Sequence, residues 1–212
     1  MTILIIEENI TLLNSMKRIL NHHGYEVDIT HDGINGLNQI LNKHYDLIIL
    51  DLNLHHISAK DILNTTYMHN IKTPFIALTK KEILSIKLLN YELVTNEYLV
   101  LPFRTKSLLY KIEKTIELSD YCYLNKGILI ENFAFRNNNE KQYLTTTEIL
   151  IIKEIADKEF ETTDNLLKIV PVIEDLWIYI DSINLKLKKV GYPLVISYQN
   201  RHYRLEELKN GK

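Results

Sequence analysis

Residues 46–54, DLIILDLNL, decide how the first half of the sequence is interpreted. Residues 47–50 form a run without a polar member, and Asp51 follows that run directly. Short uninterrupted apolar runs are typical of strands that are buried on both faces of a sheet. A carboxylate at the end of such a strand is costly, because it is held away from water. A carboxylate at position 51 is therefore unexpected unless it has a specific role.

Four further apolar runs, at 3–6, 25–29, 75–78 and 98–100, have the same strand-like character. Between the runs, apolar residues recur at the three- and four-residue spacing of amphipathic helices, including a helix expected around residues 83–89. Five repeats of strand and helix predict an α/β domain, a doubly wound (βα)5 fold with a parallel sheet and helices on both faces.

The pattern changes after residue 118. Residues 121–144 alternate apolar and polar side chains, which predicts antiparallel strands. Three helical segments follow, and Thr145 with Glu148 can form a capping box at the first of them. The last run, residues 193–206, predicts a hairpin that turns near 199–201. We therefore place a first domain at 1–118, a linker at 119–124 and an α+β domain at 125–212.

The composition favours a folded protein that stays in the cytoplasm. Apolar residues make up 46% of the 212 residues, and 25 basic residues are nearly balanced by 27 acidic ones. Cys122 is the single cysteine, so no disulfide can form within the chain, and a reducing compartment is expected. No apolar run approaches the roughly 18 residues that a membrane span requires, so no membrane partner is expected.

Polar residues gather where the predicted parallel strands end. Glu7 and Glu8 follow the first strand, Asp51 ends the third and Thr79 ends the fourth. The carboxyl ends of parallel strands meet at one edge of a sheet, where sites of such folds form. Three crowded carboxylates repel one another, and Mg²⁺ is the cation that oxygen ligands favour. The simpler interpretation is that these are solvated loop acids.

The motifs ILIIEEN (3–9), DLIILDLNL (46–54), FIALTKK (75–81) and NEYLVLPF (96–103) resemble, in order and spacing, those of response-regulator receiver domains. The resemblance covers about residues 1–118. It implies that Asp51 is the phosphoacceptor and that a histidine kinase is a possible partner. The roles that it implies for the other residues are Mg²⁺ binding by Glu7, Glu8 and the backbone carbonyl of Asn53, phosphoryl binding by Thr79, and an inward swing on activation by Tyr98.

Three departures from the receiver pattern bear on phosphorylation. Leu101 stands where the family has a lysine that bonds the phosphoryl group, and charge-assisted bonds to phosphate are strong. Glu8 stands where aspartate is usual, and the loop after Asp51 has His55 and His56 rather than its usual proline and glycine. Two interpretations stay open, namely weak phosphorylation at Asp51 and a pseudo-receiver that works without phosphate.

The second domain resembles the winged helix of the OmpR/PhoB class. LTTTEILII (144–152) is similar to the start of that fold's first helix, IDSINLKLKKVG (180–191) to the end of its recognition helix, and VISYQNRHYRLE (195–206) to its wing. Glu174 and Asn184 stand where arginines are usual, and Asn200 and His202 replace the glycines of the wing.

Double-stranded DNA is the partner that this resemblance implies. Residues 119–212 hold 13 lysines and arginines against 14 acids, so the charge alone does not indicate a DNA-binding domain. The pattern places Trp177 and Tyr179 in the core rather than on the DNA face. The basic cluster could also be a solvated face, and the domain could bind a protein instead. The DNA contacts that we expect are Asn184, Lys186, Lys188, Lys189, Tyr198 and Arg201.

The sequence as a whole therefore predicts a transcription regulator rather than an enzyme. Receivers of the OmpR/PhoB class are similar in dimerising through the fourth helix, fifth strand and fifth helix. On that face we expect Lys87, Glu97 and Lys111 to contribute to a homodimer, although Ser107 stands where an acid is usual. A phosphatase-like activity is disfavoured, because Asn53 stands two residues after Asp51, where a general acid would be needed.

Overall fold

The computed structural model describes residues 1–80, 95–119, 122–125, 128–131, 133–137, 140–158, 161–171 and 175–208. The helix expected around residues 83–89 lies outside these ranges. The chain divides into two compact units, and it passes from the first to the second between Ile116 and Glu117. Each unit is described separately below.

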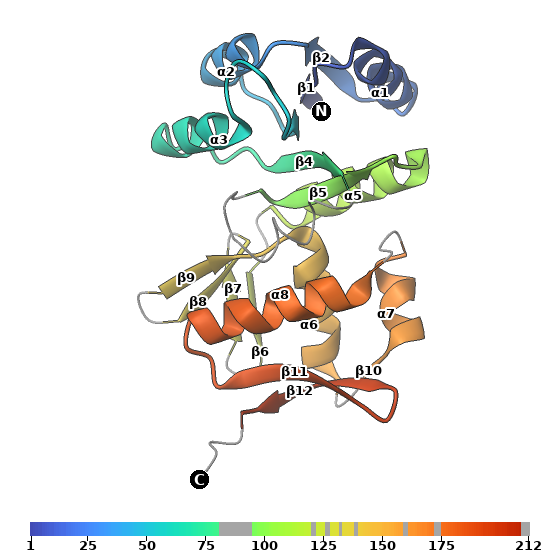
Figure 1. The fold of residues 1–212 in the computed structure, drawn as a ribbon, viewed down its shortest axis with the longest axis vertical. Coiled ribbons are helices and arrows are strands. Elements are labelled where there is room, and N and C mark those ends of the chain that lie inside the picture. Colours follow the sequence, from blue (N-terminus) through green and yellow to red (C-terminus); the bar gives the residue numbers. More distant parts are fainter. Residues whose placement is uncertain are drawn as a thin grey trace. The chain divides into compact units, whose positions relative to one another are not determined.

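The first unit contains the five-stranded parallel sheet that the apolar runs predicted, with strand order β2-β1-β3-β4-β5. Figure 1 shows α2 and α3 on one side of this sheet, and α1 and α5 on the other. The strands are β1 (Thr2–Ile6), β2 (Glu26–Thr30), β3 (Leu47–Asp51), β4 (Phe75–Lys80) and β5 (Glu97–Leu101). The helices are α1 (Ile10–His22), α2 (Gly33–Asn42), α3 (Ala59–Met68) and α5 (Thr105–Glu117).

Both faces of this sheet are buried, which explains the apolar runs. Successive side chains of a strand point to opposite faces, so Ile3 and Ile5 join one hydrophobic core while Leu4 and Ile6 join another. Asp51 is the last residue of β3, the central strand of the sheet. The fold thus brings Asp51 to the carboxyl edge of the sheet, beside the residues that follow β1.

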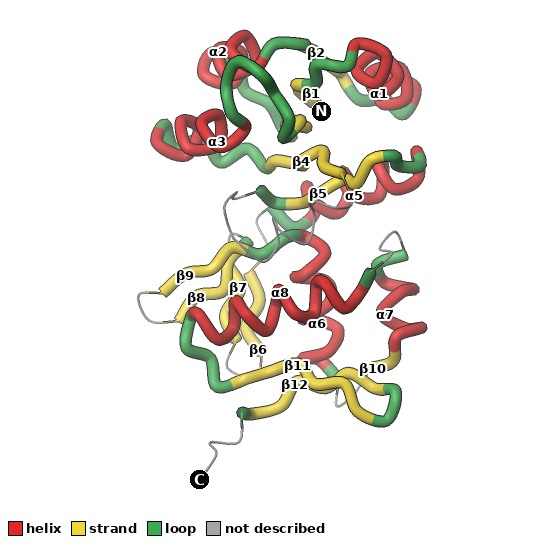
Figure 2. Tube along the Cα trace, viewed as in Figure 1, coloured by secondary structure: helices red, strands yellow, loops and turns green. Residues whose placement is uncertain are grey.

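The described residues of the second unit form two small antiparallel sheets and three helices (Figure 2). The strands β6 (Cys122–Asn125), β7 (Ile128–Glu131), β8 (Ala134–Asn137) and β9 (Glu140–Tyr143) form one sheet in sequence order. The helices α6 (Thr146–Asp157), α7 (Thr163–Ile169) and α8 (Leu176–Lys189) follow. The strands β10 (Glu161–Thr162), β11 (Leu194–Gln199) and β12 (His202–Glu207) form the second sheet, and β11 and β12 are the predicted hairpin. This arrangement is consistent with a winged helix.

Local sequence signals set the ends of several elements. Thr145 and Glu148 form the predicted capping box at the start of α6. Asn200 and Arg201 both have positive φ, 52° and 66°, as the two-residue turn of a type I′ hairpin requires. Strand β6 occupies residues 122–125, so the end of the predicted linker, 119–124, belongs to a strand.

Across the described ranges, no helix is both long and apolar enough to pass through a lipid bilayer.

Candidate functional site

The acidic cluster predicted at the carboxyl edge of the parallel sheet is assembled from the ends of β1 and β3. Glu7 follows β1, and its side chain is 3% exposed, while Asp51 is 7% exposed. One carboxylate oxygen of Glu7 accepts a hydrogen bond of 2.8 Å from the backbone N–H of Asn9. Asp51 Oδ1 accepts one of 3.0 Å from the backbone N–H of Asn53. Both carboxylates are therefore held in place by backbone donors of the loops after the strands.

Burial changes the acidity of these two carboxyl groups. Desolvation, together with the charges of Asp51 and Glu8, raises the pKa of Glu7 to about 7. Desolvation also raises the pKa of Asp51, and the backbone N–H of Asn53 opposes that rise. Perturbed acids in close company are common at functional sites. The cluster carries less negative charge at neutral pH than its composition suggests.

Glu8 is turned toward the loop after β3. Its carboxylate accepts a hydrogen bond of 2.7 Å from the backbone N–H of His55 and also contacts the His55 ring Nδ1. The backbone bond is the main reason that the pKa of Glu8 is lowered. Among the described residues, no group of three or more His, Cys, Asp or Glu side chains is arranged to hold a metal ion. Two of the three predicted acidic ligands thus lie in the cluster, while the third is engaged by His55.

Thr79 and Tyr98, the other two predicted signalling residues, lie on neighbouring strands, β4 and β5. Thr79 is fully buried, and its hydroxyl donates a bond of 3.3 Å to the carbonyl of Lys80. Tyr98 is 2% exposed. Leu101, which replaces the usual lysine, packs against the hydrophobic core beneath α1 and α5.

The prediction that Glu97 and Lys111 offer surface charges to a second chain is wrong. Both side chains are buried within the first unit, and Lys111 Nζ lies 3.2 Å from Glu97 Oε1. The reason is that β5 and α5 pack together, so the two charges face each other inside one chain. Lys87, the third residue predicted on that face, lies outside the described residues.

The prediction that Lys186 contacts DNA is also wrong. Lys186 is 4% exposed, and its Nζ lies 2.7 Å from each carboxylate oxygen of Glu148 on α6. The hydroxyl of Ser182 donates a further bond of 2.6 Å to Glu148. Glu148 also accepts the backbone N–H of Thr145. This buried network joins α8 to the start of α6, so Lys186 anchors the helix.

Asn184, predicted to contact a base, is used within the domain. Its Nδ2 donates to the carbonyl of Ile196 at 2.9 Å, and its Oδ1 accepts the Ile196 N–H at 2.6 Å. The two bonds fix strand β11 to α8. The prediction that the Asn184 amide contacts a base is therefore wrong, because both of its polar atoms are already bonded to Ile196.

The remaining predicted DNA contacts are accessible. Lys188, Lys189 and Arg201 are exposed, and Tyr198 is 56% exposed with its ring against that of Tyr203. Trp177 corrects the expectation of a core position, because it is 58% exposed, whereas Tyr179 is buried as expected. The accessible polar and aromatic residues that the sequence reasoning missed are Trp177, Asp181 and Arg204.

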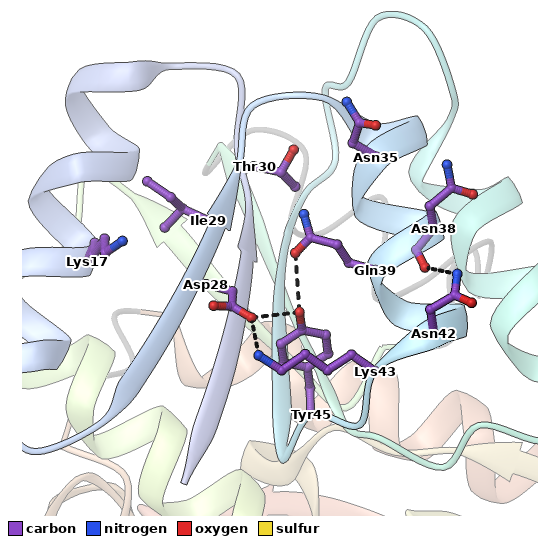
Figure 3. Close-up of a pocket in the computed structure, with 10 residues that line it drawn as sticks. All are labelled: Lys17, Asp28, Ile29, Thr30, Asn35, Asn38, Gln39, Asn42, Lys43 and Tyr45. Atoms are coloured by element: carbon purple, nitrogen blue, oxygen red, sulfur yellow. Dashed lines mark hydrogen bonds and ion pairs between the residues drawn. The ribbon is translucent and has the colours of Figure 1, made fainter.

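A polar hollow of about 710 Å³ lies away from the acidic cluster, along the outer strand β2. Figure 3 shows Asp28 at one end of it, where its carboxylate accepts bonds from Lys43 Nζ at 2.6 Å and from the Tyr45 hydroxyl at 2.8 Å. Amide side chains of α2 line the opposite wall. Asp28 and Lys43 are already paired with each other, so the hollow offers a hydrogen-bonded surface rather than free opposite charges.

A receiver-like sheet with paired acids at its carboxyl edge, followed by a winged-helix-like unit, defines a two-domain signalling protein. Comparison with known proteins agrees. The family described as response regulator receiver domain matches residues 3–113. The response regulator ArlR of Staphylococcus saprophyticus is 32% identical over 84% of this chain and 80% of its own length. ArlR of Staphylococcus aureus strain Mu50 is 30% identical with the same coverage. The chain therefore belongs to the response regulator family.

Solved structures extend the likeness to the whole fold. A mutant of RitR superposes with a TM-score of 0.67 at 20% identity, covering 97% of this chain and 99% of that one. The receiver domain of a sensor histidine kinase from Pseudomonas aeruginosa, solved with a magnesium ion in its active site cleft, has a TM-score of 0.50 at 24% identity. It covers 55% of this chain and 97% of that one.

Proposed function

We propose that this response regulator controls transcription by binding double-stranded DNA through α8 and the β11–β12 wing, and that it does so without phosphorylation at Asp51. The observation that carries the first part is a helix whose exposed side lies next to a hairpin with arginines at its turn and on its second strand. The observation that carries the second part is the engagement of Glu8 by His55. The two parts are argued separately.

DNA binding is supported by where the accessible cations lie. Lys188 and Lys189 are exposed at the end of α8, and Arg201 and Arg204 are exposed on the wing. Lysine and arginine supply the phosphate contacts on which affinity for DNA depends. The second domain is nearly neutral overall, but four of its exposed cations lie on these two elements, where they can form part of an electrostatic footprint for DNA.

Independence from phosphate is supported by the state of the acidic cluster. The first support is the hydrogen bond of Glu8 to His55, which draws one acid away from the others. The second is Leu101, which cannot bond a phosphoryl group. The third is Tyr98, which corresponds to the aromatic residue that turns inward on activation and is buried in this structure. Together these three features favour a receiver domain that is active without phosphorylation of Asp51.

Mg²⁺ remains compatible with the chemistry of the cluster. Glu7 and Asp51 are the carboxylates that would hold it, with the backbone carbonyl of Asn53. Burial is the main reason that the pKa values of both carboxyl groups are raised, and neighbouring carboxylates raise them further. When bound, the cation would offset charge on a phosphoryl group. Asp51 would be the phosphoacceptor for a histidine kinase, oriented by the N–H of Asn53, with the Thr79 hydroxyl beside it. We propose that phosphorylation of Asp51 is weak.

The test is enrichment of fragmented genomic DNA by the unmodified full-length protein and by Asp51→Ala, followed by sequencing. We expect both proteins to enrich the same few sites, which share a direct repeat. Enrichment by wild type only after treatment with acetyl phosphate and Mg²⁺, and never by Asp51→Ala, would contradict independence from phosphate. Absence of enrichment under every condition would contradict DNA binding.

A second candidate function is a protein-interaction module. It is favoured by the use of Asn184 and Lys186 inside the domain, which removes two of the predicted DNA contacts. Salt separates the two functions, because affinity for DNA falls steeply as salt rises, whereas binding to an apolar protein surface changes little.

A further inference from the structure

The solvent-facing side of α8 differs from the side that the sequence predicted. Trp177, Asp181 and Lys188 are exposed, and Leu185 is half-buried between them. These residues follow one another at intervals of four, four and three positions, which places them in one stripe along an α-helix. Lys186 comes nine positions after Trp177, which is about two and a half turns, and so lies on the opposite side. The buried ion pair of Lys186 therefore fixes the rotation that exposes the stripe.

Trp177 gives the stripe an apolar surface in the first turn of α8. Its side chain is 58% exposed, although burial of an indole is one of the larger apolar gains available to a protein. An exposed aromatic residue of this size favours an apolar contact with a ligand. In the major groove of DNA, the apolar feature that distinguishes one base from the others is the methyl group of thymine.

Asp181 gives the stripe a hydrogen-bond acceptor. It is exposed, and it forms no hydrogen bond or ion pair with any residue that the structure describes. The residues one turn away on either side, Trp177 and Leu185, carry no charge that could pair with it. A carboxylate only accepts hydrogen bonds. In the major groove it can accept from the amino group of cytosine, whereas guanine presents two acceptors there and would repel it.

The charges around the stripe fit a DNA duplex. The exposed cations Lys188, Lys189, Arg201 and Arg204 lie at the end of α8 and on the wing, while Asp181, the acid of the stripe, lies in its middle. The wing also carries an exposed acid, Glu207, at the end of β12 that is remote from the turn. A duplex has the same distribution in reverse, because its phosphates border the groove and its base edges lie between them. Cations at the border with an acid and an aromatic ring between them therefore match DNA.

We infer that Trp177 and Asp181 set the base preference of this protein, with Trp177 contacting a thymine methyl group and Asp181 accepting from a cytosine amino group. This inference rests on the proposed function. The two residues are four positions apart, or about 6 Å along the helix. Because base pairs are stacked about 3.4 Å apart, each half-site should contain a thymine and, within about two base pairs, a cytosine.

The test is selection from random-sequence duplexes by the full-length protein and four variants, with sequencing of the bound fraction. Trp177→Ala should lose the preference for thymine at one position by at least about fivefold, while Trp177→Leu keeps an apolar contact and most of that preference. Asp181→Ala should lose the cytosine preference to a similar extent. Asp181→Asn should exchange it for adenine, because an asparagine amide bonds adenine through two atoms.

Glu113→Gln is the matched control, because it removes one exposed acid from α5 in the first unit without touching α8. It should select the same sites as wild type. Unchanged base preference in all four variants, even with weaker overall binding, would overturn the inference and leave the proposed function standing. A wild-type protein that enriches no sequence, with or without acetyl phosphate and Mg²⁺, would overturn both.

Discussion

At the scale of single residues, the protein holds buried charges in two kinds of arrangement. Glu148 and Lys186 are opposite charges within hydrogen-bond distance, and Ser182 bonds the same carboxylate. Glu7 and Asp51 are like charges held beside each other by the ends of two strands. The first arrangement stabilises the fold, whereas the second stores repulsion that only a proton or a cation can relieve.

The buried pair in the second domain predicts a large loss of stability when it is broken. Lys186→Met leaves the Glu148 carboxylate buried without its cation, and breaking such a pair costs about 3–5 kcal/mol. Urea unfolding followed by circular dichroism measures the loss. Lys188→Met, which removes an exposed lysine two residues further on, should stay within about 0.5 kcal/mol of wild type. Equal effects of the two substitutions would show that Lys186 is not the anchor.

The acidic cluster predicts a stability that depends on pH. The pKa of Glu7 is about 7 in the folded chain, above its ordinary value of 4.5. Between pH 4.5 and pH 7, Glu7 is therefore mostly protonated in the folded state and mostly ionised in the unfolded state. Stability therefore falls as pH rises from about 4.5 to about 7. Glu7→Gln removes this dependence and should be roughly 1–3 kcal/mol more stable than wild type at pH 8.

Below pH 4.5 Glu7 is protonated in both the folded and the unfolded state of wild type. The higher stability of Glu7→Gln should therefore vanish there. Chemical denaturation of both proteins at pH 4.5, 6 and 8 measures the difference directly. Addition of Mg²⁺ at pH 8 should raise the midpoint of wild type more than that of Glu7→Gln. A constant difference at all three values would mean that Glu7 ionises with its ordinary acidity.

At the scale of elements, Asn184 joins α8 to the first strand of the wing. Asn184 fixes β11 to α8 through both of its polar atoms. Beyond that point the hairpin extends to Asn200 and Arg201, whose backbone is in the left-handed region. A residue other than glycine or asparagine pays a steric cost there. Arg201 thus occupies a place that local backbone energy disfavours, which suggests that its side chain is needed.

Arg201→Gly should therefore affect stability and binding in opposite directions. Removal of the left-handed strain should stabilise the fold by up to about 1 kcal/mol, while affinity for DNA falls and the salt slope of log K decreases by about 1. Arg204→Gly is the matched control, because Arg204 lies in the extended strand β12 and gains no relief. Thermal unfolding and fluorescence anisotropy at several salt concentrations measure both effects. A less stable Arg201→Gly would show that the turn is not strained.

At the scale of the whole molecule, we expect the chain to form a homodimer through its first unit. The charges of Glu97 and Lys111 are buried and paired with each other in this structure, so neither is presented at the surface. A receiver-mediated homodimer would therefore depend on apolar contacts. We expect sedimentation velocity at micromolar concentration to show a dimer without phosphate, and the dimer to be little changed between about 0.1 M and 0.5 M salt. A monomer, or a dimer that dissociates with salt, would contradict this expectation.

The sequence predicted the elements well and the faces of the helices less well. The five apolar runs became the parallel sheet, because strands that are buried on both faces need apolar side chains at nearly every position. The capping box and the hairpin turn were also predicted correctly, since both depend on neighbouring residues. Lys186, Asn184, Glu97 and Lys111 were misplaced for a common reason. Their partners lie on other elements, and only the packing of α8 on α6, of β11 on α8 and of α5 on β5 reveals them.

The sequence limits, but does not decide, which side of α8 faces a ligand. Trp177 and Lys186 lie on opposite sides of any continuous helix, so at most one of them can face a ligand. The capping box predicted from the sequence already gives the Glu148 carboxylate a hydrogen-bond donor, the backbone N–H of Thr145. It therefore gave no sign that Glu148 also pairs with Lys186. The choice between the two sides was therefore not available from local pattern alone.

The Lys186–Glu148 ion pair and the exposed stripe lie on opposite sides of α8, and this placement has an evolutionary consequence. Because the ion pair that holds the helix lies on the side away from Trp177 and Asp181, residues that choose the DNA sequence can be replaced without loosening the domain. Relatives of this chain could therefore acquire new target sites by single substitutions, each of them nearly neutral for folding. A regulator built in this way can be reassigned to other genes faster than its fold can change.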